Sequence, residues 1–363
     1  MEDVRVAIWG LGAMGTGIGR VLARRRGVTL VGGVDADPEK VGQPLGRFVD
    51  EPSIDVPVDG SFEGMSQRAV ADLCVIATSS FVSDVSPQVE RVLGAGMDCI
   101  TIAEEMAFPA ARDPEAALRL NRLAREAGKT VLGTGINPGF VLDTLIIALT
   151  GACIDVRAIR ARRVNDLGPF GPTVMKTQGV GSTPEEFRRG LADGSIVGHV
   201  GFPESMLMIA RALGWKLDRI DQTREPIIAG EDRVGEHIRV PAGRVAGCNH
   251  SARGYIGDRL VIELEHPQQV QPAAASVDTG DFVEIDGTPD ISMAISPEIP
   301  GGIGTIAVTV NALPAVLAAP AGLLTMAELP VPRNLAGDVG EILDLLRDPG
   351  AETNWRGIGL GTQ

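Results

Sequence analysis

The feature that most constrains this chain is a glycine pattern close to its N-terminus. Residues 4–10 form the apolar run VRVAIWG, and Gly10-Leu-Gly12-Ala-Met-Gly15 then opens a helix-like stretch over 12–26. In a strand–turn–helix unit the first glycine permits the turn, the second lets the backbone approach a pyrophosphate, and the third lets helix and strand pack closely. A glycine-rich turn that binds nothing is the weaker alternative. We therefore predict a dinucleotide site formed by Gly10, Gly12, Ala13, Met14 and Gly15.

An acidic residue stands where the same fingerprint requires one. Asp35 ends the next predicted strand, 29–36, about twenty residues after the glycines. A carboxylate there binds the ribose 2′-hydroxyl of NAD and repels the extra phosphate of NADP. We therefore expect NAD or NADP as the cofactor, with NAD favoured. Thr78 and Ser79 follow the strand at 71–77 and are expected to line the far side of the cofactor, although a capped turn before a helix explains them equally well.

Short β-branched runs alternate with helix-like segments through the first part of the chain. Continuous apolar strands separated by helices are typical of a parallel sheet covered on both faces. We therefore predict a doubly wound α/β fold, a Rossmann domain, over residues 1–145. The expected strands span 4–10, 29–36, 71–79, 98–105 and 130–137, and the expected helices span 12–26, 83–95 and 110–127.

The pattern changes after about residue 150, where polar and apolar residues alternate along several runs. Such alternation indicates strands with one solvated side, usually in an antiparallel sheet. We predict an α+β substrate domain with a largely antiparallel sheet over 146–301. The segment 302–363 begins with helical periodicity and is expected to pack back on the Rossmann domain. The alternating runs span 156–166, 233–248, 258–267 and 281–287, with helices at 184–192 and 203–213.

Charge and composition restrict the partners. The chain has 33 basic and 47 acidic residues, a net charge of −14, which opposes non-specific binding to nucleic acid or to an anionic membrane. The most apolar late stretch is interrupted by Asn311, Pro314 and Pro320, so we predict no membrane span. Widely spaced cysteines indicate neither a disulfide framework nor a zinc site. The N-terminus reads as a strand and not as a leader, so we expect a cytoplasmic protein.

Two adjacent carboxylates stand at the end of the predicted strand 98–105. Ligands of open α/β sheets bind beyond the carboxyl ends of the strands, so Glu104 and Glu105 are candidates for the reacting site. A carboxylate shielded from water has a raised pKa and can act as a general base. The alternative is that one of them is a helix N-terminal charge or a salt-bridge partner.

Four further segments carry a resemblance to a known family. Together with Glu104 and Glu105, the chain resembles the 2,4-diaminopentanoate dehydrogenases and their relatives, the native amine dehydrogenases, with a Rossmann half similar to dihydrodipicolinate reductase. The resemblance implies NAD(P)-dependent oxidative deamination, reversible as reductive amination, and a glutamate at the strand end as the catalytic base. We prefer Glu104, but the sequence does not separate it from Glu105. The segments are GTGINPGFVLDT (133–144), GHVGFPES (198–205), IPGGIGTIAVTVNALP (299–314) and APAGLLTM (319–326).

The remaining site candidates follow from their places beside these motifs. Asn137 and Phe140 are expected beside the nicotinamide, although the Pro138-Gly139 pair explains the same segment as a hinge between domains. His199 is a candidate substrate contact, with a structural role equally open. Arg160 and Arg162 share one face of a strand and could hold a substrate carboxylate, although ordinary surface charge is the alternative. His237, His250 and His266 show no metal-ligand spacing and receive no role.

Two other functions compete with amine oxidation. The first is a reductase of C=N or C=C bonds like dihydrodipicolinate reductase, but the basic His-His/Lys cluster that protonates its product is not evident here. The second is a non-enzymatic nucleotide-binding sensor, which would need no carboxylate at the nicotinamide. We expect a small amine or ketone as the substrate. A homodimer formed through the sheet of the second domain is expected by analogy with this architecture.

Overall fold

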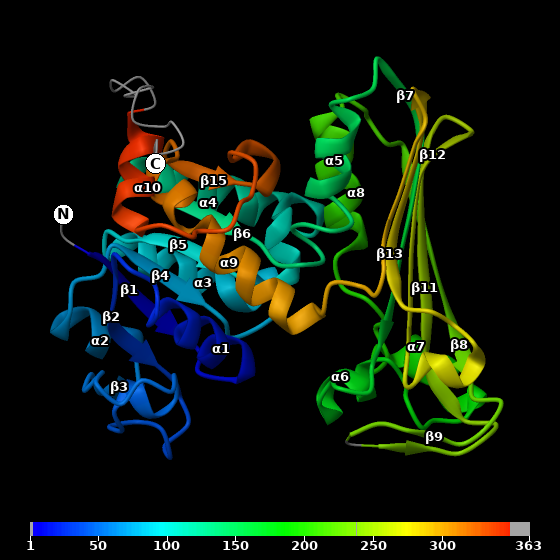
Figure 1. Ribbon diagram of the computed structural model, residues 1–363, viewed down its shortest axis with the longest axis horizontal. Coiled ribbons are helices and arrows are strands. Elements are labelled where there is room, and N and C mark those ends of the chain that lie inside the picture. The colour runs from blue at the N-terminus through cyan, green and yellow to red at the C-terminus, as the bar shows by residue number, and fades with distance from the viewer. Residues whose placement is uncertain (1–2, 237, 349–363) are drawn as a thin grey trace, which may run out of the picture.

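The computed structural model describes residues 3–236 and 238–348, which form two domains side by side (Figure 1). The first domain is built on a seven-stranded parallel sheet in the order β3-β2-β1-β4-β5-β6-β15. The first six strands have the Rossmann order, and the last strand comes from the C-terminal segment. The strands are β1 (Val4–Trp9), β2 (Val28–Val34), β3 (Val58–Asp59), β4 (Leu73–Ile76), β5 (Asp98–Thr101), β6 (Thr130–Gly133) and β15 (Gly322–Leu324).

Helices cover both faces of this sheet, because its strands are apolar on both sides. One face packs against α1 (Ala13–Leu22), α9 (Gly301–Ala318) and α10 (Val339–Arg347). The other face packs against α2 (Phe62–Arg68), α3 (Val82–Gly94) and α4 (Pro114–Ala127). Short 3₁₀ turns complete the domain: η1 (Leu45–Arg47), η2 (Glu104–Ala107), η3 (Pro109–Ala111) and η5 (Met326–Glu328).

The second domain is a six-stranded sheet in the order β14-β13-β7-β12-β11-β8. All neighbouring pairs are antiparallel except β7 and β12, so both the Rossmann fold and the largely antiparallel second sheet are confirmed. The strands are β7 (Asp155–Asp166), β8 (Arg219–Ile228), β11 (Val245–Ile256), β12 (Arg259–Gln269), β13 (Gly280–Thr288) and β14 (Ile291–Ile295), and β9 (Arg233–Val234) and β10 (Arg239–Val240) form a separate hairpin. The alternating run 233–248 thus contains β9, β10 and the start of β11.

One face of the second sheet looks toward the Rossmann domain and is covered by α5 (Thr144–Thr150) and α8 (Phe202–Ala212) (Figure 1). We call this the inner face. Its core includes Ile159, Ala161 and Leu264 from the sheet and Phe202 from α8. The remaining helical segments, α6 (Pro172–Thr177), α7 (Pro184–Asp193) and η4 (Pro272–Ala275), lie toward the end of the sheet near β9.

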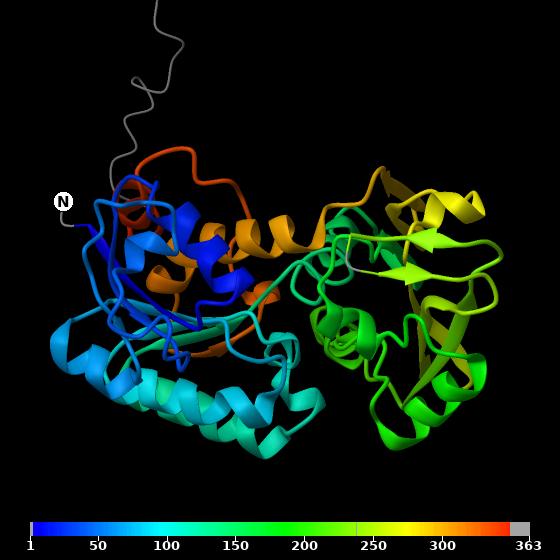
Figure 2. The same cartoon turned by 90° about the horizontal axis from the view of Figure 1, so that it is seen from below.

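Helix α9 extends from the second domain across the Rossmann domain (Figure 2). By length and composition it is the one helix among the described residues that could cross a membrane, with a mean hydropathy of 1.6. Its apolar side chains, including Val308 and Leu313, pack in the same core as β1 and β5. We therefore describe α9 as a core helix of the Rossmann domain.

Candidate active site

The turn between β1 and α1 has the geometry of an anion site. Gly10 has a φ of +97°, which favours glycine, and a Cβ on Gly15 would lie 1.8 Å from the Gly10 carbonyl oxygen. A Cβ on Gly12 would meet no atom within 4 Å, so the surface beside it is open. No side chain caps the start of α1, which leaves the amides of Ala13 and Met14 directed outward at its N-terminus.

Asp35 lies beside this turn at the end of β2, as predicted. Its carboxylate accepts hydrogen bonds from the amides of Leu11 (2.8 Å) and Asp37 (2.9 Å), and Lys40 Nζ lies 3.1 Å from it. Burial alone would raise the pKa of Asp35, but these amides and the ammonium hold it below its usual range. Lys40 is an unpredicted cation at the position where the sequence places the ribose.

The hydroxyls of Thr78 and Ser79 are directed to α3. Thr78 Oγ1 donates to Gln88 (2.6 Å), and Ser79 Oγ donates to Asp84 (2.6 Å). Their main-chain segment nevertheless borders the glycine turn, because a Cβ on Gly10 would lie 3.0 Å from Thr78 Cγ2. Both hydroxyls are therefore engaged by side chains of α3, but neither caps this helix, and a cofactor contact through this segment stays a prediction.

Glu104 and Glu105 begin η2, directly after β5, and the structure separates their roles. Glu105 Oε2 accepts a hydrogen bond from the amide of Val82 at the start of α3 (2.9 Å), and Glu105 Oε1 lies 3.2 Å from Arg112 Nε. Glu105 therefore has the structural role that the sequence left open, as a helix-terminal charge and salt-bridge partner.

Glu104 pairs with no cation among the described residues, and Ser80 supplies a hydrogen bond to its side chain. Part of the Glu104 surface stays accessible, although protein atoms surround most of its carboxylate. Burial raises the pKa of Glu104, and the neighbouring Glu105 carboxylate raises it further against the effect of Ser80. A carboxylate with a raised pKa is a stronger base than an ordinary one, so Glu104 is suited to accept a proton and return it.

Asn137 lies at the end of the strand next to β5 in the sheet. Both its Oδ1 and its Nδ2 are buried and have no partner among the described residues. An amide with a free donor and a free acceptor matches the needs of a carboxamide ligand. The loop is held from several sides: Asp143 accepts from the Gly139 amide (2.7 Å) and from Ser205 of α8 (2.9 Å), and Thr305 of α9 accepts from the Ile136 amide (3.2 Å).

His199 and Phe140 lie where the two domains join. Phe140 is half-buried and packs against the cores of both domains. His199 is buried, its Nε2 has no partner among the described residues, and a Cβ on Gly201 would lie 3.4 Å from that nitrogen and 2.5 Å from Pro138 Cδ. His199 therefore neighbours the Asn137 loop, as a substrate contact there would require.

Behind His199, a single row of polar side chains crosses five strands of the inner face. We call Arg224, His250, His266, Arg163 and Asp281 the polar row. The His199 ring lies 4.9 Å from the His266 ring and 6.5 Å from the His250 ring, measured between centroids. His250 and His266 thus lie beside the candidate site, although the sequence assigned them no role. His237 lies outside the described residues.

The histidines near this row are neutral. His250 Nδ1 accepts from the His199 amide (3.1 Å), so its Nε2 carries the hydrogen that is donated to Gln222 (3.1 Å). Burial lowers the pKa of His199 to about 3, and burial together with the Arg224 charge lowers the pKa of His250 to about 2. The pKa of His266 is lowered for the same reason, burial first. Among the described residues, no group of potential ligands could hold a metal.

Arg160 and Arg162 do not reach this site. They alternate with Ile159, Ala161 and Arg163, which belong to the inner face, so they lie on the outer face of the sheet. Their guanidinium groups lie 3.8 Å from Glu263 and 3.9 Å from Glu265. The structure therefore corrects the expectation that they hold a substrate carboxylate in this site. The alternation in the sequence shows that Arg160 and Arg162 lie on the same face of the strand, but it does not show which face of the sheet is turned toward the first domain.

Several residues of the site were missed from the sequence. Arg112 follows η3 and joins the two domains, because its Nε lies 3.2 Å from Glu105 and 2.9 Å from Glu204 of α8. Burial raises the pKa of Glu204, whose Oε2 has no partner in the described part of the chain, while Arg112 opposes the increase. Ser80 and Arg112 stand in loops outside any motif. Glu204 stands inside the GHVGFPES segment, which was the one available signal.

Comparisons with known proteins agree with this architecture. The sequence pattern of the family described as 2,4-diaminopentanoate dehydrogenase C-terminal domain matches residues 140–345. The 2,4-diaminopentanoate dehydrogenase of Acetoanaerobium sticklandii is 45% identical over 346 residues, which cover 94% of this chain and 98% of that protein. An amine dehydrogenase of Streptomyces virginiae is 24% identical over 317 residues, covering 80% of this chain and 84% of that protein.

Solved structures show the same fold. The amine dehydrogenase from Mycobacterium smegmatis superposes with a TM-score of 0.82 at 26% identity, covering 92% of this chain and 98% of that chain. GenD2 from gentamicin A biosynthesis, solved in complex with NAD, gives a TM-score of 0.53 at 15% identity, covering 95% of this chain and 92% of that chain. The second likeness supports the fold alone.

Proposed function

This chain belongs to the 2,4-diaminopentanoate dehydrogenase family, and we propose that it catalyses the NAD(P)-dependent oxidative deamination of a small amine or diamino acid. The observation that carries this proposal is Glu104, a carboxylate with a raised pKa and no cationic partner among the described residues. It follows the strand beside Asn137, at the edge of the sheet where the glycine turn opens α1. That edge is where open α/β sheets bind dinucleotides.

We propose that Glu104 moves the protons of this reaction. The substrate ammonium gives a proton to the Glu104 carboxylate, which leaves a free amine. The bound NAD(P)⁺ supplies the hydride acceptor. Loss of hydride from the carbon leaves an iminium. Once Glu104 has released its first proton to solvent, its carboxylate accepts a proton from the water that adds to the iminium carbon and then gives this proton to the leaving amine. The carbinolamine releases ammonia, so a CH–NH₃⁺ group and water yield a ketone and ammonium, with the hydride on the cofactor and one proton in solvent.

The residues present fit a nicotinamide dinucleotide. The outward amides of Ala13 and Met14 and the open surface at Gly12 suit the pyrophosphate. The unpartnered amide of Asn137 suits the carboxamide of the nicotinamide, and the half-buried apolar ring of Phe140 suits exclusion of water. These assignments, with Gly10 and Gly15 shaping the turn, are part of the proposal.

We propose that NAD is preferred and that NADP is also accepted to some degree. The Asp35 carboxylate opposes a 2′-phosphate, but Lys40 Nζ lies 3.1 Å from it and offsets part of its charge. A nearby ammonium is also a common phosphate ligand. The cytoplasmic location and the homodimer through the second sheet stay predictions, the latter open to a mass measurement by light scattering.

The proposal is tested by the reduction of NAD⁺ and NADP⁺ with a panel of amines, followed by nicotinamide absorbance and by released ammonia. Glu104→Gln should bind cofactor normally and lose turnover by about 10²–10⁴-fold, because an amide cannot accept the proton. Glu105→Gln is the matched control and should retain most of the turnover. It loses the ion pair with Arg112 and lowers the pKa of Glu104 slightly, but it keeps an oxygen for the Val82 amide and leaves the Glu104 carboxylate in place. Unchanged turnover in Glu104→Gln would remove Glu104 as the base.

The competing reductase makes a different prediction in the same assay. An enzyme limited to a preformed C=N or C=C bond would oxidise NAD(P)H with a cyclic imine and would show no amine-dependent reduction of NAD(P)⁺. A nucleotide-binding sensor would bind cofactor and show neither activity.

A further inference from the structure

Arg224 is a cation of the inner face with no carboxylate partner. It lies on β8, directly opposite His250 of β11, and it forms no ion pair with the described residues. The hydrogen bond recorded for its guanidinium runs from Nε to the Val197 carbonyl oxygen (2.8 Å). Its Nη donors are not among the buried atoms that lack a partner, so they reach solvent from a half-buried position and stay available to a ligand.

The groups around Arg224 supply no negative charge to balance its positive charge. The histidines beside it are neutral, and burial raises the pKa of Cys248 to about 12, so its thiol stays protonated. Burial lowers the pKa of Arg224, and the positive charge of Arg112 lowers it further. The location therefore favours an anion, because a charge-assisted pair with a guanidinium is strongest where water is partly excluded.

One short segment lies between Arg224 and the proposed reacting site. A Cβ on Gly198 would lie 3.4 Å from Arg224 Nε and 3.1 Å from His250 Nδ1. The next residue, His199, donates its amide to the same His250 nitrogen and approaches Pro138 of the Asn137 loop. Arg224 is thus separated from that loop by one short segment, 198–201.

The other cations nearby already have carboxylate partners. Arg112 is paired with Glu105 and Glu204, and Arg163 of the polar row is paired with the buried Asp281. A substrate carboxylate at either of them would meet a carboxylate of the protein. Arg224 has no such competitor among the described residues.

We propose that Arg224 binds a carboxylate of the amine substrate and makes that carboxylate a condition of efficient turnover. The inference rests on the proposed function. Segment 198–201 lies between Arg224 and the Asn137 loop, so the proposal places the carboxylate on the second-domain side of the site and the reacting amine beside Glu104.

The test compares 2,4-diaminopentanoate with 1,3-diaminobutane, which has the same two amines and lacks the carboxylate. We expect the wild-type enzyme to prefer the carboxylate substrate in kcat/KM. Arg224→Gln should lower kcat/KM for 2,4-diaminopentanoate by about tenfold to hundredfold, mainly through KM, and leave 1,3-diaminobutane nearly unchanged. Arg224→Lys should restore part of the loss, because it keeps the charge but not the planar fork.

Arg219→Gln is the matched control on the same strand. Arg219 is exposed, pairs with Asp221 (2.9 Å) and stacks on Tyr255, so its loss should leave both substrates unaffected. Equal losses for both substrates in Arg224→Gln would show a structural role and overturn the carboxylate site. Equal wild-type turnover of both amines would overturn it as well, with the proposed function intact. No turnover of any amine would instead remove the proposed function itself.

Discussion

At the scale of single residues, the pKa of Glu104 depends on a hydroxyl next to it. Ser80 donates a hydrogen bond to this side chain and thereby opposes the increase that burial causes. Ser80→Ala removes a bond to the ionised form, so the pKa of Glu104 should rise further. Since the base acts when deprotonated, the acid limb of kcat/KM in the oxidative direction should move to higher pH, while turnover above that limb approaches the wild-type value.

A pH–rate profile from pH 5 to about 10 measures this shift. Ser83→Ala is a suitable control, because Ser83 bonds to Asp84 in the exposed first turn of α3. A limb that stays in place in Ser80→Ala would show that Ser80 does not act on the base.

The sequence could predict only part of the site at this scale. Glu104 and Asn137 could be found because the carboxyl ends of parallel strands gather at one edge. The choice between Glu104 and Glu105 could not be predicted, because adjacent residues of a 3₁₀ turn point in different directions. Only the contacts of Glu105 with Val82 and Arg112 show that its carboxylate is already paired. Arg224 was missed because it lies on a strand that the sequence did not indicate.

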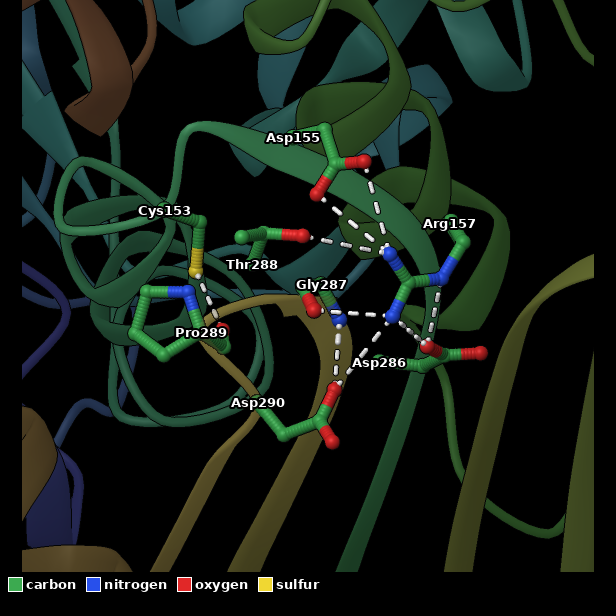
Figure 3. A network of polar contacts seen from close by, with 8 residues as sticks. All are labelled: Cys153, Asp155, Arg157, Asp286, Gly287, Thr288, Pro289 and Asp290. Carbon is green, nitrogen blue, oxygen red and sulfur yellow. Dashed lines mark hydrogen bonds and ion pairs between the residues drawn. The ribbon is translucent and has the colours of Figure 1, made fainter.

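At the scale of elements, β7 and β13 are joined by two arginines in contrasting settings. Arg163 and its partner Asp281 are buried, and Arg163 Nη2 also donates to the Ile299 carbonyl oxygen (2.6 Å). Arg157 is exposed at the end of β7, where it contacts Asp155, Asp286, Asp290 and the Gly287 carbonyl oxygen (Figure 3). If the number of contacts determined the contribution to stability, Arg157 would contribute more. If burial determined it, Arg163 would contribute more.

We expect burial to decide their contributions to stability. Arg163→Met should lower the free energy of unfolding by about 3–5 kcal/mol, because it leaves Asp281 buried without its cation. Arg157→Met should lower it much less, since solvent screens an exposed network. Urea unfolding of both variants measures the difference. Equal losses in the two variants would contradict this account of the sheet.

Elements with strong patterns were predicted well, and short elements were not. The helices expected over 83–95 and 184–192 match α3 and α7 within two residues at each end. Strand β15 was missed because it has three residues inside a segment of helical periodicity, and it exists through pairing with β6. The alternation over 233–248 indicated strands but did not reveal the turns that divide the run into β9, β10 and the start of β11.

At the scale of the whole molecule, the proposed chemistry depends on how the domains meet. The base comes from the Rossmann domain, the polar row comes from the second sheet, and α9 returns from the second domain to the first (Figure 2). The resemblance predicted from the four motifs is confirmed over nearly the whole chain by a relative that is 45% identical over 346 residues. The sequence did not reveal the charged contact that spans the junction, since its partners stand far apart in the chain.

That contact joins Arg112 of the first domain to the buried Glu204 of α8 (2.9 Å). Arg112→Met should lower the free energy of unfolding at neutral pH by about 1–3 kcal/mol, less than for a fully buried pair, because Arg112 is 39% exposed. Arg112 favours the ionised form of Glu204, so its contribution is present above the pKa of Glu204 and is lost as the pH falls through it. Burial has raised that pKa, so the loss should begin at a higher pH than for an ordinary glutamate.

Urea unfolding of wild type and Arg112→Met between pH 4 and pH 8 measures this pH dependence. Arg119→Met, which breaks an exposed pair with Glu90, is the control. A difference between wild type and Arg112→Met that is constant over this range would mean that Arg112 stabilises the junction by packing and not by its charge.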